Sequence, residues 1–525
     1  MNLKEIFVAR TNDLNDGEMK SFPIEDGNEI LLTKIDGQFY AMGVHCTHYG
    51  ASLVEGVLCN GVIICPWHHA CFNAKTGDLL EPPARDSLRN YEVKINGDDV
   101  IVKIPDKPDP GRLPEMTKPD PESDKRIFVI LGGGAAGNAA AQALREAGFK
   151  GNIVMITQEN RLPYDRPNLS KAYLSGEAQA EWMPLRSEDF YKEYGIEVLF
   201  NKKIKDVNLA GKEIITGNDE KLTYDKLLIA TGGVPRKLNV SGSNLENIFY
   251  LRSFDDADNI IHAAKEGAKV VVIGASFIGM ETAFSLHERK LDVTVIAPEN
   301  VPFENIFGKE IGNLFKKVHE EYGVKFKLGS RISKLEGESK VEEVILEGGE
   351  RIKTNFVVIG IGVKPATDFI KGIDLQKDGS IKVNEFFQVN DDVYAAGDIA
   401  RFYHTYSNQS IRIEHWRTAE QQGRIAGFNM AGNKSRFNSG LFFWTEQAGL
   451  NLKYVGYAKE WDNIYTLGDV SSKEFISFFI KDGKVIAAAG NNRNKEIAAV
   501  ECLMRNGKTI SADKLKDKSY ELLKK

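Results

Sequence analysis

The first hundred residues contain short runs in which apolar and polar positions alternate, which is the pattern of half-buried β-strands. Turn signals separate these runs, and Asp36-Gly37, Asn60-Gly61 and Asn96-Gly97 are strong hairpin signals. The pattern predicts strands over residues 5–10, 29–35, 38–43, 57–65 (around the second of these turns), 91–95 and 100–104. We therefore expect residues 1–104 to form a small all-β domain, with two loops that carry Cys and His at one end.

From residue 126 onward, buried apolar runs alternate with glycine turns and helical stretches. The run 126–131 leads into a glycine turn and an expected helix over 138–147, and a second copy of this unit covers 270–289. Strand, glycine turn and helix in this order are typical of Rossmann-like α/β domains. We expect one such domain over 126–250 and 384–432, a second inserted at 251–383, and a C-terminal α+β domain over 433–525. The predicted fold class is therefore multidomain, with an all-β module, two Rossmann-like domains and an α+β domain.

The segment between the β domain and the first α/β domain, residues 105–125, holds six of the 17 prolines, interleaved with charges. This composition predicts a semi-rigid, extended linker, and its first 17 residues could span up to roughly 50 Å at about 3.1 Å each. The β domain could therefore reach a site in its own chain or in a neighbouring protomer. The sequence does not choose between them, and a homodimer is compatible with it.

Composition narrows the class of protein. At 525 residues, with 42% apolar and 27% charged residues, the chain is typical of a soluble protein of about three or four domains. A net charge of −6 without a long basic block argues against nucleic acid as a partner. Five cysteines argue against a disulfide-stapled secreted protein, and we expect Cys59 and Cys71 to be small buried thiols and Cys502 to stand alone. No signal-peptide pattern opens the chain and no apolar stretch approaches the roughly 20 residues of a membrane span, so we expect a cytoplasmic protein.

The two loops of the β domain carry a mirrored pair of metal-binding clips, Cys46-Thr47-His48 and, sixteen residues later, Cys65-Pro66-Trp67-His68. Two thiolates and two imidazoles can hold a two-iron cluster, with the cysteines on one iron and the histidines on the other. Zinc is the competing interpretation, but zinc sites more often use paired Cys-x-x-Cys clips. The flanking His45 and His69 do not fit the ligand spacing.

This motif resembles that of Rieske [2Fe–2S] domains. High-potential members of that family add a cysteine to each loop, and a serine and a tyrosine that bond toward the cluster. The corresponding positions here are Ala51, Trp67, Ala70 and Phe72. Fewer donors stabilise the reduced cluster less, so the resemblance implies a low-potential cluster of the ferredoxin type, which NADH can reduce.

The first glycine turn predicts a dinucleotide site. Its residues Gly132, Gly134, Ala135 and Gly137 would let the backbone approach a pyrophosphate at the N-terminus of the following helix. Glu159, about 20 residues further on, is the expected carboxylate for the adenine ribose. An exposed loop charge is the alternative for Glu159.

Three further segments resemble the FAD-dependent pyridine-nucleotide oxidoreductases, in the branch of the ferredoxin reductases and apoptosis-inducing factors. They are Thr231 and Gly232 after the strand 226–229, Gly397 and Asp398 after the strand 393–396, and the loop 162–171. The resemblance implies that Arg166 and Lys171 lie on the flavin and that the backbone near Ile204 borders the adenine. Asp398 suits a ribityl hydroxyl, and a plain surface lysine is the alternative for Lys171.

The second glycine turn, with Gly274, Ser276 and Gly279, predicts the nicotinamide half of the site. Ser276 replaces the middle glycine, which weakens the motif. The resemblance implies that Glu281 faces the nicotinamide and pairs with Lys171, so we assign these two as catalytic. A helix N-terminal carboxylate that complements the dipole is the alternative for Glu281.

The preference between NADH and NADPH is predicted from the residues at the end of the next expected strand, near Ala297. No arginine cluster awaits a 2′-phosphate there, and Glu299 could take the ribose hydroxyls, which favours NADH over NADPH. Ala297 stands where an acid is usual. Gly362, after the run 356–361, resembles the family's closing wall of the nicotinamide site.

The last candidates follow residue 400. His415 and Trp416 match a helix N-terminus that faces the flavin pyrimidine, where the helix dipole would stabilise an anionic reduced flavin. A structural histidine is the alternative for His415. In relatives an aromatic residue covers the flavin, a role that fits Phe443 or Trp444, and plain core packing is the alternative for both.

Nearly the whole chain resembles the Rieske-containing, apoptosis-inducing-factor-like oxidoreductases of the factor 3 type. This implies electron transfer from NADH through FAD to the chain's own cluster and on to an external acceptor, protein or small molecule. The alternative is a redox-gated signalling protein whose shape changes when NADH binds. The absence of Cys-x-x-Cys excludes a disulfide-reductase mechanism, and no spare pair of closely spaced histidines suits an oxygenase iron. The sequence does not name the acceptor.

Overall fold

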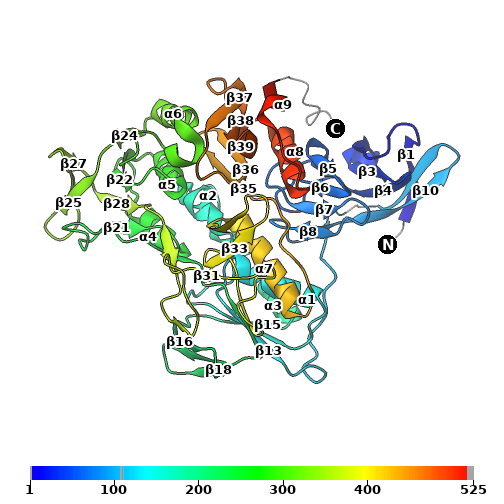
Figure 1. The fold of residues 1–525 in the computed structure, drawn as a ribbon, viewed down its shortest axis with the longest axis horizontal. Helices are drawn as coiled ribbons and strands as arrows, with labels where there is room; N and C mark the ends of the chain where they lie inside the picture. Colours follow the sequence, from blue (N-terminus) through cyan, green and yellow to red (C-terminus); the bar gives the residue numbers. More distant parts are fainter. Residues whose placement is uncertain (1–2, 107–108, 110, 517–525) are drawn as a thin grey trace.

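The computed structural model describes residues 3–106, 109 and 111–516. Figure 1 shows the N-terminal strands at one end of the molecule, beside the C-terminal helices, while the α/β domains occupy the other side. The first and last parts of the chain are therefore neighbours in space. No helix in the described ranges is both long and apolar enough to cross a membrane.

The N-terminal module consists of two main antiparallel sheets. The larger has the order β1-β11-β10-β4-β3-β2, with strands Leu3–Arg10, Asp99–Pro105, Asn90–Asn96, Gln38–Gly43, Glu29–Ile35 and Met19–Pro23. The smaller has the order β5-β6-β7-β8, with strands Val57–Cys59, Val62–Ile64, Cys71–Asn73 and Leu79–Glu81. The run expected over 57–65 is a hairpin whose turn lies at Asn60 and Gly61, which have φ angles of 49° and 77°. The two clip-bearing loops join β4 to β5 and β6 to β7.

The described parts of the expected linker lie against the protein rather than spanning open space. Strand β12 (Gly111–Arg112) pairs with β9 (Ser87–Leu88) of the module. Further along, the amide of Thr117 donates to Arg145 O and that of Asp120 to Lys150 O, both at 2.9 Å. Three residues of the expected linker, 107, 108 and 110, lie outside the described residues.

Two parallel five-stranded sheets form the α/β part. The first is β15-β14-β13-β19-β32, with strands Ile196–Leu199, Asn152–Ile156, Ile127–Leu131, Lys226–Ile229 and Val393–Ala395. The second is β21-β28-β22-β23-β24, with strands Ile248–Tyr250, Phe356–Ile359, Lys269–Ile273, Asp292–Ala297 and Lys325–Leu328. Their nearly continuous Val, Ile and Leu content fits sheets that are covered on both faces.

Smaller strands join and edge these sheets. They are β16 (Ile204–Asn208), β17 (Glu213–Thr216), β18 (Lys221–Thr223), β20 (Gly233–Pro235), β25 (Ile332–Glu336), β26 (Glu343–Leu346), β27 (Arg351–Lys353), β29 (Val363–Pro365), β30 (Ile370–Lys371), β31 (Ile381–Lys382), β33 (Ala400–His404) and β34 (Gln409–Arg412). The helices of this part are α1 (Ala135–Glu146), α2 (Ala172–Ser175), α3 (Glu188–Glu193), α4 (Phe254–Ala263), α5 (Phe277–Glu288), α6 (Glu304–Tyr322) and α7 (Trp416–Met430).

Helices α1 and α7 pack unusually closely because small residues face each other between them. A Cβ at Gly423 would lie 2.0 Å from Ala136 O, and one at Gly427 would lie 2.6 Å from Ala140 O. Gly397 is part of the same contact, since a Cβ there would be 3.5 Å from that of Ala136. The close approach brings the glycine turn before α1 and the loop before α7 to the same end of the domain.

The C-terminal domain is an antiparallel sheet covered by two helices. Its order is β35-β36-β39-β38-β37, with strands Phe442–Gln447, Leu450–Gly456, Lys484–Asn491, Glu474–Lys481 and Asn463–Asp469. Helices α8 (Asn494–Arg505) and α9 (Ala512–Lys516) follow. The core of the second α/β domain continues into this sheet through Leu452, Tyr454 and Phe479.

A disulfide joins Cys59 on β5 to Cys502 on α8, across 443 positions of sequence. Two expectations are therefore wrong, because Cys59 is not a free thiol and Cys502 does not stand alone. Cys71 is a buried free thiol, as expected. The bond lies in an apolar contact in which Val57 and Ile64 pack on Ala498 and Ala499. The N-terminal module is thus crosslinked to the C-terminal domain of its own chain.

Candidate functional site

The two clip-bearing loops have the same backbone design. In the first, the Cys46 amide donates to Ala51 O and the Gly50 amide to Cys46 O, both at 2.9 Å. In the second, the Cys65 amide donates to Ala70 O at 2.9 Å and the His69 amide to Cys65 O at 3.2 Å. His69 therefore occupies the place of Gly50, and both have positive φ, 56° and 78°. Positive φ is uncommon outside glycine, although histidine adopts it more often than most residues.

The four expected ligands form two pairs. His48 Nδ1 and His68 Nδ1 are 3.1 Å apart, close enough for both to bind one iron. The thiols of Cys46 and Cys65, both buried, lie within hydrogen-bond reach of each other. The described part of the chain contains no group of three or more His, Cys, Asp or Glu side chains that could together hold a single metal ion. Two separate pairs match the donor set of a Rieske cluster.

The protonation chemistry of these pairs also suits a cluster. Burial lowers the pKa of His48 to about 3 and that of His68 well below its usual value, so both imidazoles are neutral, as iron ligands must be. The amides of His48 and Tyr49 donate to the Cys46 sulfur, and those of Trp67 and His68 donate to the Cys65 sulfur. Such donors favour the thiolate form that binds iron, and at Cys46 they oppose the contact with Cys65 and the burial, which together raise its pKa. The residues present therefore fit a two-iron cluster.

Both glycine turns form the cradles that the sequence predicts. Gly132 has φ of 121°, and a Cβ there would lie 2.2 Å from Ala230 O. Gly274 has φ of 113°, and a Cβ there would lie 2.3 Å from Gly360 O. Gly137 and Gly279 repeat the arrangement one turn into their helices, where a Cβ would meet the carbonyl of Gly132 or Gly274. Each helix begins three residues before its predicted start, because the end of the glycine turn is already helical.

The remaining small residues of the two turns leave space for a ligand or support the loops. A Cβ at Gly134 would meet nothing within 4 Å. Ala135 begins α1, and Ser276 precedes α5 with its hydroxyl 3.4 Å from Gly360 O. Thr231 donates to Ala366 O at 2.8 Å.

A network of hydrogen bonds and ion pairs links three residues that the sequence predicts for the flavin site. Arg166 bonds Glu159 at 2.8 Å, and Tyr164 bonds the same carboxylate at 2.6 Å. Arg166 and Tyr164 hold the pKa of Glu159 below its usual value although burial opposes them. Arg252, which sequence reasoning missed, donates to Asp398 at 2.9 Å, and Arg166 donates to the Arg252 carbonyl. The structure therefore brings together Glu159, Arg166 and Asp398 through an arginine that no motif marks.

The expected catalytic pair is in contact. Lys171 Nζ donates to Glu281 Oε2 at 2.8 Å, and Ser170 donates to the same oxygen at 2.6 Å. The other oxygen of this buried carboxylate accepts from Thr445 of the C-terminal sheet at 2.8 Å. Ser170 and Thr445 were not predicted, because a hydroxyl in a loop or strand carries no motif. The C-terminal domain thus helps to fix Glu281.

Other expected residues lie in strands and turns of the two α/β domains. Ile204 begins β16, half-buried, against the core of the first α/β domain. Glu299 is half-buried just beyond β23. Gly232, Gly362 and Gly397 have positive φ in the turns after β19, β28 and β32.

His415 and Trp416 begin α7, which faces the aromatic residues of β35. Burial lowers the pKa of His415 to about 3, so its ring is neutral. Its buried Nδ1 finds no hydrogen-bond partner among the described residues. The His415 ring centroid is 5.5 Å from that of Phe443 and 5.4 Å from that of Trp444.

Phe443 and Trp444 project from opposite faces of β35. Phe443 packs on Phe277 of α5, on the side of the second cradle, with ring centroids 5.1 Å apart. Trp444 packs on His68 of the second clip, with centroids 4.3 Å apart. Trp444 thus lies between an expected cluster ligand and His415 at the N-terminus of α7.

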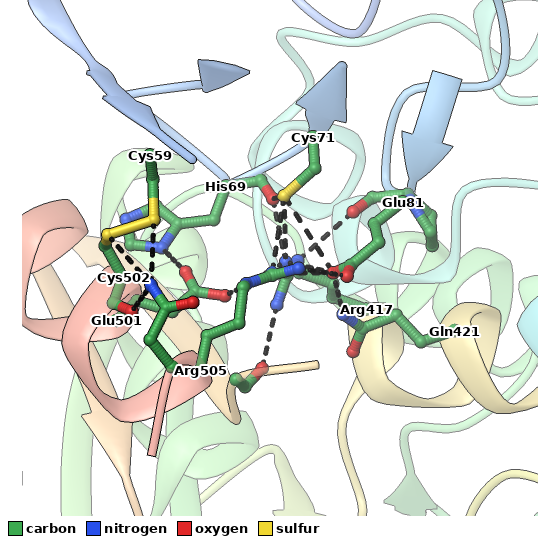
Figure 2. A network of polar contacts seen from close by, with 12 residues as sticks. Cys59, His69, Cys71, Glu81, Arg417, Gln421, Glu501, Cys502 and Arg505 are labelled. Atoms are coloured by element: carbon green, nitrogen blue, oxygen red, sulfur yellow. Dashed lines mark hydrogen bonds and ion pairs between the residues drawn. A yellow bond between two sulfur atoms is a disulfide. The ribbon is translucent and has the colours of Figure 1, made fainter. Parts of the chain in front are cut away.

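A buried cluster of charges docks the N-terminal module, and Figure 2 shows it. Glu81 of β8 and Glu501 of α8 share two guanidinium groups, those of Arg417 on α7 and Arg505 on α8, at 3.0–3.4 Å. Arg417 and Arg505 hold the pKa of both carboxyls below the usual range although burial opposes them. Two negative and two positive charges therefore balance in the contact between three parts of the chain.

His69 fits into this cluster. Burial lowers the pKa of His69 to about 4, so the ring is neutral and its Nδ1–H donates to the Glu501 carboxylate. The ring stacks on Phe442 with centroids 3.7 Å apart, and Arg417 bonds the His69 carbonyl at 2.8 Å (Figure 2). These contacts explain the positive φ of His69. They also fix the neighbouring clip residue His68.

Comparison with known proteins agrees with this architecture. Family models match for a Rieske [2Fe–2S] domain over residues 4–92, for pyridine nucleotide-disulphide oxidoreductase over residues 127–423 and for a reductase C-terminal domain over residues 442–525. Apoptosis-inducing factor 3 of Homo sapiens is 37% identical over 96% of this chain and 85% of its own length. The chain belongs to the apoptosis-inducing factor 3 family.

The fold of most of the chain is similar to solved structures of ferredoxin reductases. Putidaredoxin reductase, in its covalent complex with putidaredoxin, gives a TM-score of 0.72 with 30% identity over 76% of this chain and 97% of its own. A ferredoxin reductase from Rhodopseudomonas palustris gives 0.71 with 28% identity over 76% and 99%. The predicted fold class is confirmed. The chain is an NAD(P)H-dependent FAD oxidoreductase that carries a Rieske domain.

We expect Cys65→Ala to abolish the electron-paramagnetic resonance signal of a reduced Rieske cluster while the flavin absorbance is retained. Cys65 would be an iron ligand, whereas Cys71, six residues on, is a buried thiol whose pKa burial raises to about 12. Cys71→Ala is therefore the matched control and should keep the signal. A signal that survives in the Cys65 variant would refute the ligand assignment.

We expect Arg417→Met to lower the free energy of unfolding by about 3–5 kcal/mol, because it leaves buried carboxylates without their counter-charge. Arg436→Met, which removes an exposed ion pair with Glu385, should cost less than about 1 kcal/mol. Equilibrium urea unfolding of the two variants measures the difference. Equal losses would mean that the buried charge cluster does not stabilise docking.

Proposed function

We propose that the chain transfers electrons from NADH, through FAD, to its own [2Fe–2S] cluster and then to an external acceptor. When bound, FAD accepts two electrons from a nicotinamide and releases them singly, and the cluster carries one electron at a time. The observation that most supports this proposal is the contact of His68, Trp444 and His415, which joins the cluster loops to the N-terminus of α7 within one chain.

In this proposal the protein's own residues hold and orient the cofactors. Cys46, His48, Cys65 and His68 would hold the cluster. The turn from Gly132 to Gly137 would take the FAD pyrophosphate, with its negative charge at the N-terminus of α1. The other residues that the sequence predicts for the FAD and NAD sites would make the cofactor contacts expected of them there. Domain boundaries at 104, 125, 250, 383 and 432 are part of the same proposal.

Lys171 and Glu281 would fix the geometry where the two nucleotides meet. The Glu281 carboxylate accepts three hydrogen bonds, so its position is set by groups from two segments of the chain, the adjacent Ser170 and Lys171 and the distant Thr445. It in turn holds the Lys171 ammonium at the mouth of the site, where this side chain keeps 22% of its exposure. Such preorganisation lowers the cost of orienting a nicotinamide against the flavin.

The preference for NADH and the nature of the acceptor belong to the proposal as well. In this proposal Glu299, beyond β23, would take ribose hydroxyls rather than a phosphate. Relatives are named for both protein and small-molecule acceptors: a rubredoxin-NAD(+) reductase of Pseudomonas putida and a monodehydroascorbate reductase of Cucumis sativus. A cytoplasmic location also stays a proposal, and there the Cys59–Cys502 bond would have to survive reducing conditions.

Stopped-flow spectroscopy of the loaded protein tests the proposed function. We expect NADH to bleach the flavin band and then the cluster band, with many turnovers when an acceptor such as ferricyanide is present. NADPH should act at least tenfold more slowly, since Glu299 would repel its extra phosphate. Flavin bleaching without cluster reduction or turnover would contradict the proposal and favour a redox-gated signalling protein instead.

A further inference from the structure

Lys453, on β36, is a lysine buried inside the C-terminal domain, with 2% of its surface exposed. Its Nζ donates to Asn494 Oδ1 at the start of α8, and among the described residues it forms an ion pair with no carboxylate. Glu446, which acts on it electrostatically, is an exposed side chain. A buried ammonium without a paired carboxylate is unfavourable unless other negative charge lies nearby.

The position of Lys453 in the sheet shows where that negative charge would be. Lys453 is directly opposite Trp444 in the antiparallel pair β35–β36, so both side chains project from the same face. Trp444 packs on His68 from this face. Among the charged groups that act on Lys453, Cys65 has the largest electrostatic effect. Lys453 also acts electrostatically on His68. The ammonium therefore faces the second ligand loop of the Rieske module.

Lys453 remains charged in this position. Burial lowers its pKa to about 8, against the opposing effects of Cys65 and Glu446. Other positive charges also act on the expected ligands, Arg85 of the Rieske module on His48 and Lys171 on His68.

We propose that Lys453 is a positioning residue that raises the reduction potential of the docked cluster. A cluster held by two thiolates and two neutral imidazoles gains one negative charge when it accepts an electron. A fixed ammonium in a poorly solvated contact stabilises that added charge more than it would at the surface. Because Lys453 belongs to the C-terminal domain, docking of the Rieske module on that domain would itself raise the reduction potential of the cluster. The proposal rests on the cluster assignment made above.

The same coupling acts in the other direction. If docking makes the cluster easier to reduce, then reduction must strengthen docking by the same factor. The reduced module would therefore stay on its own reductase surface more firmly than the oxidised one. Where the Cys59–Cys502 disulfide is reduced, this bias would hold the module in place until an external acceptor removes the electron.

Redox titration of the loaded protein at pH 7, followed by the cluster's electron-paramagnetic resonance signal, tests the proposal. We expect Lys453→Met to lower the midpoint potential by an amount that corresponds to about a tenfold change in equilibrium constant, or about 59 mV for one electron. Lys453→Arg, which keeps the positive charge, should change the midpoint potential by less than a third of that amount. Lys484→Met, an exposed lysine of the same sheet, is the matched control and should leave the potential unchanged.

A second variant keeps the test open if Lys453→Met fails to fold. Asn494→Asp places a carboxylate at the atom that Lys453 already bonds, so it would neutralise the ammonium with almost no change in volume. Aspartate also suits the first residue of a helix. We expect this variant to lower the potential in the same direction as Lys453→Met.

An unchanged potential in the Asn494→Asp and Lys453→Met proteins would overturn the proposal. Equal decreases for the Met and Arg variants would overturn it too, because they would indicate packing rather than charge. Absence of the resonance signal from the unsubstituted protein would instead show that the cluster assignment, and with it the proposed function, is wrong.

Discussion

The structure depends on one buried set of balanced charges, made by Glu81, Glu501, Arg417 and Arg505. They come from β8, α7 and α8, so three parts of the chain must come together before any of them is neutralised. Removing charges from water is costly, and a misplaced module would leave carboxylates or guanidinium groups buried without partners. This penalty opposes other arrangements of the Rieske module on the reductase more strongly than apolar contact alone would.

The buried charges also determine the positions of residues on the candidate electron path. His69 bonds Glu501 and stacks on Phe442, and this fixes the backbone of the second ligand loop in a left-handed turn. The adjacent residue, His68, is then held against Trp444. The strand β35 separates two environments, since Trp444 faces the cluster loops while Thr445 bonds Glu281 on the nucleotide side. A single strand thus relates the positions of the two chemical sites.

The sequence predicts local features of this protein well and distant pairings poorly. Hairpins at Asp36-Gly37 and Asn60-Gly61 and the strands after them follow from backbone preferences that a few residues determine. Both glycine cradles follow from strand, turn and helix order, and the Lys171–Glu281 contact follows from family resemblance. In contrast, Arg417 and Glu501 look like ordinary surface charges in the sequence. Cys59 and Cys502 are 443 positions apart, and no local pattern pairs them.

The central claim is that the cluster accepts electrons from the flavin of its own chain. The most direct test is the rate of cluster reduction by saturating NADH, measured by stopped flow across a tenfold or greater range of protein concentration. Transfer within the docked chain predicts a first-order rate constant that does not change with concentration. A rate constant that rises in proportion to protein concentration would mean that the cluster is reduced by another molecule, and would contradict the account.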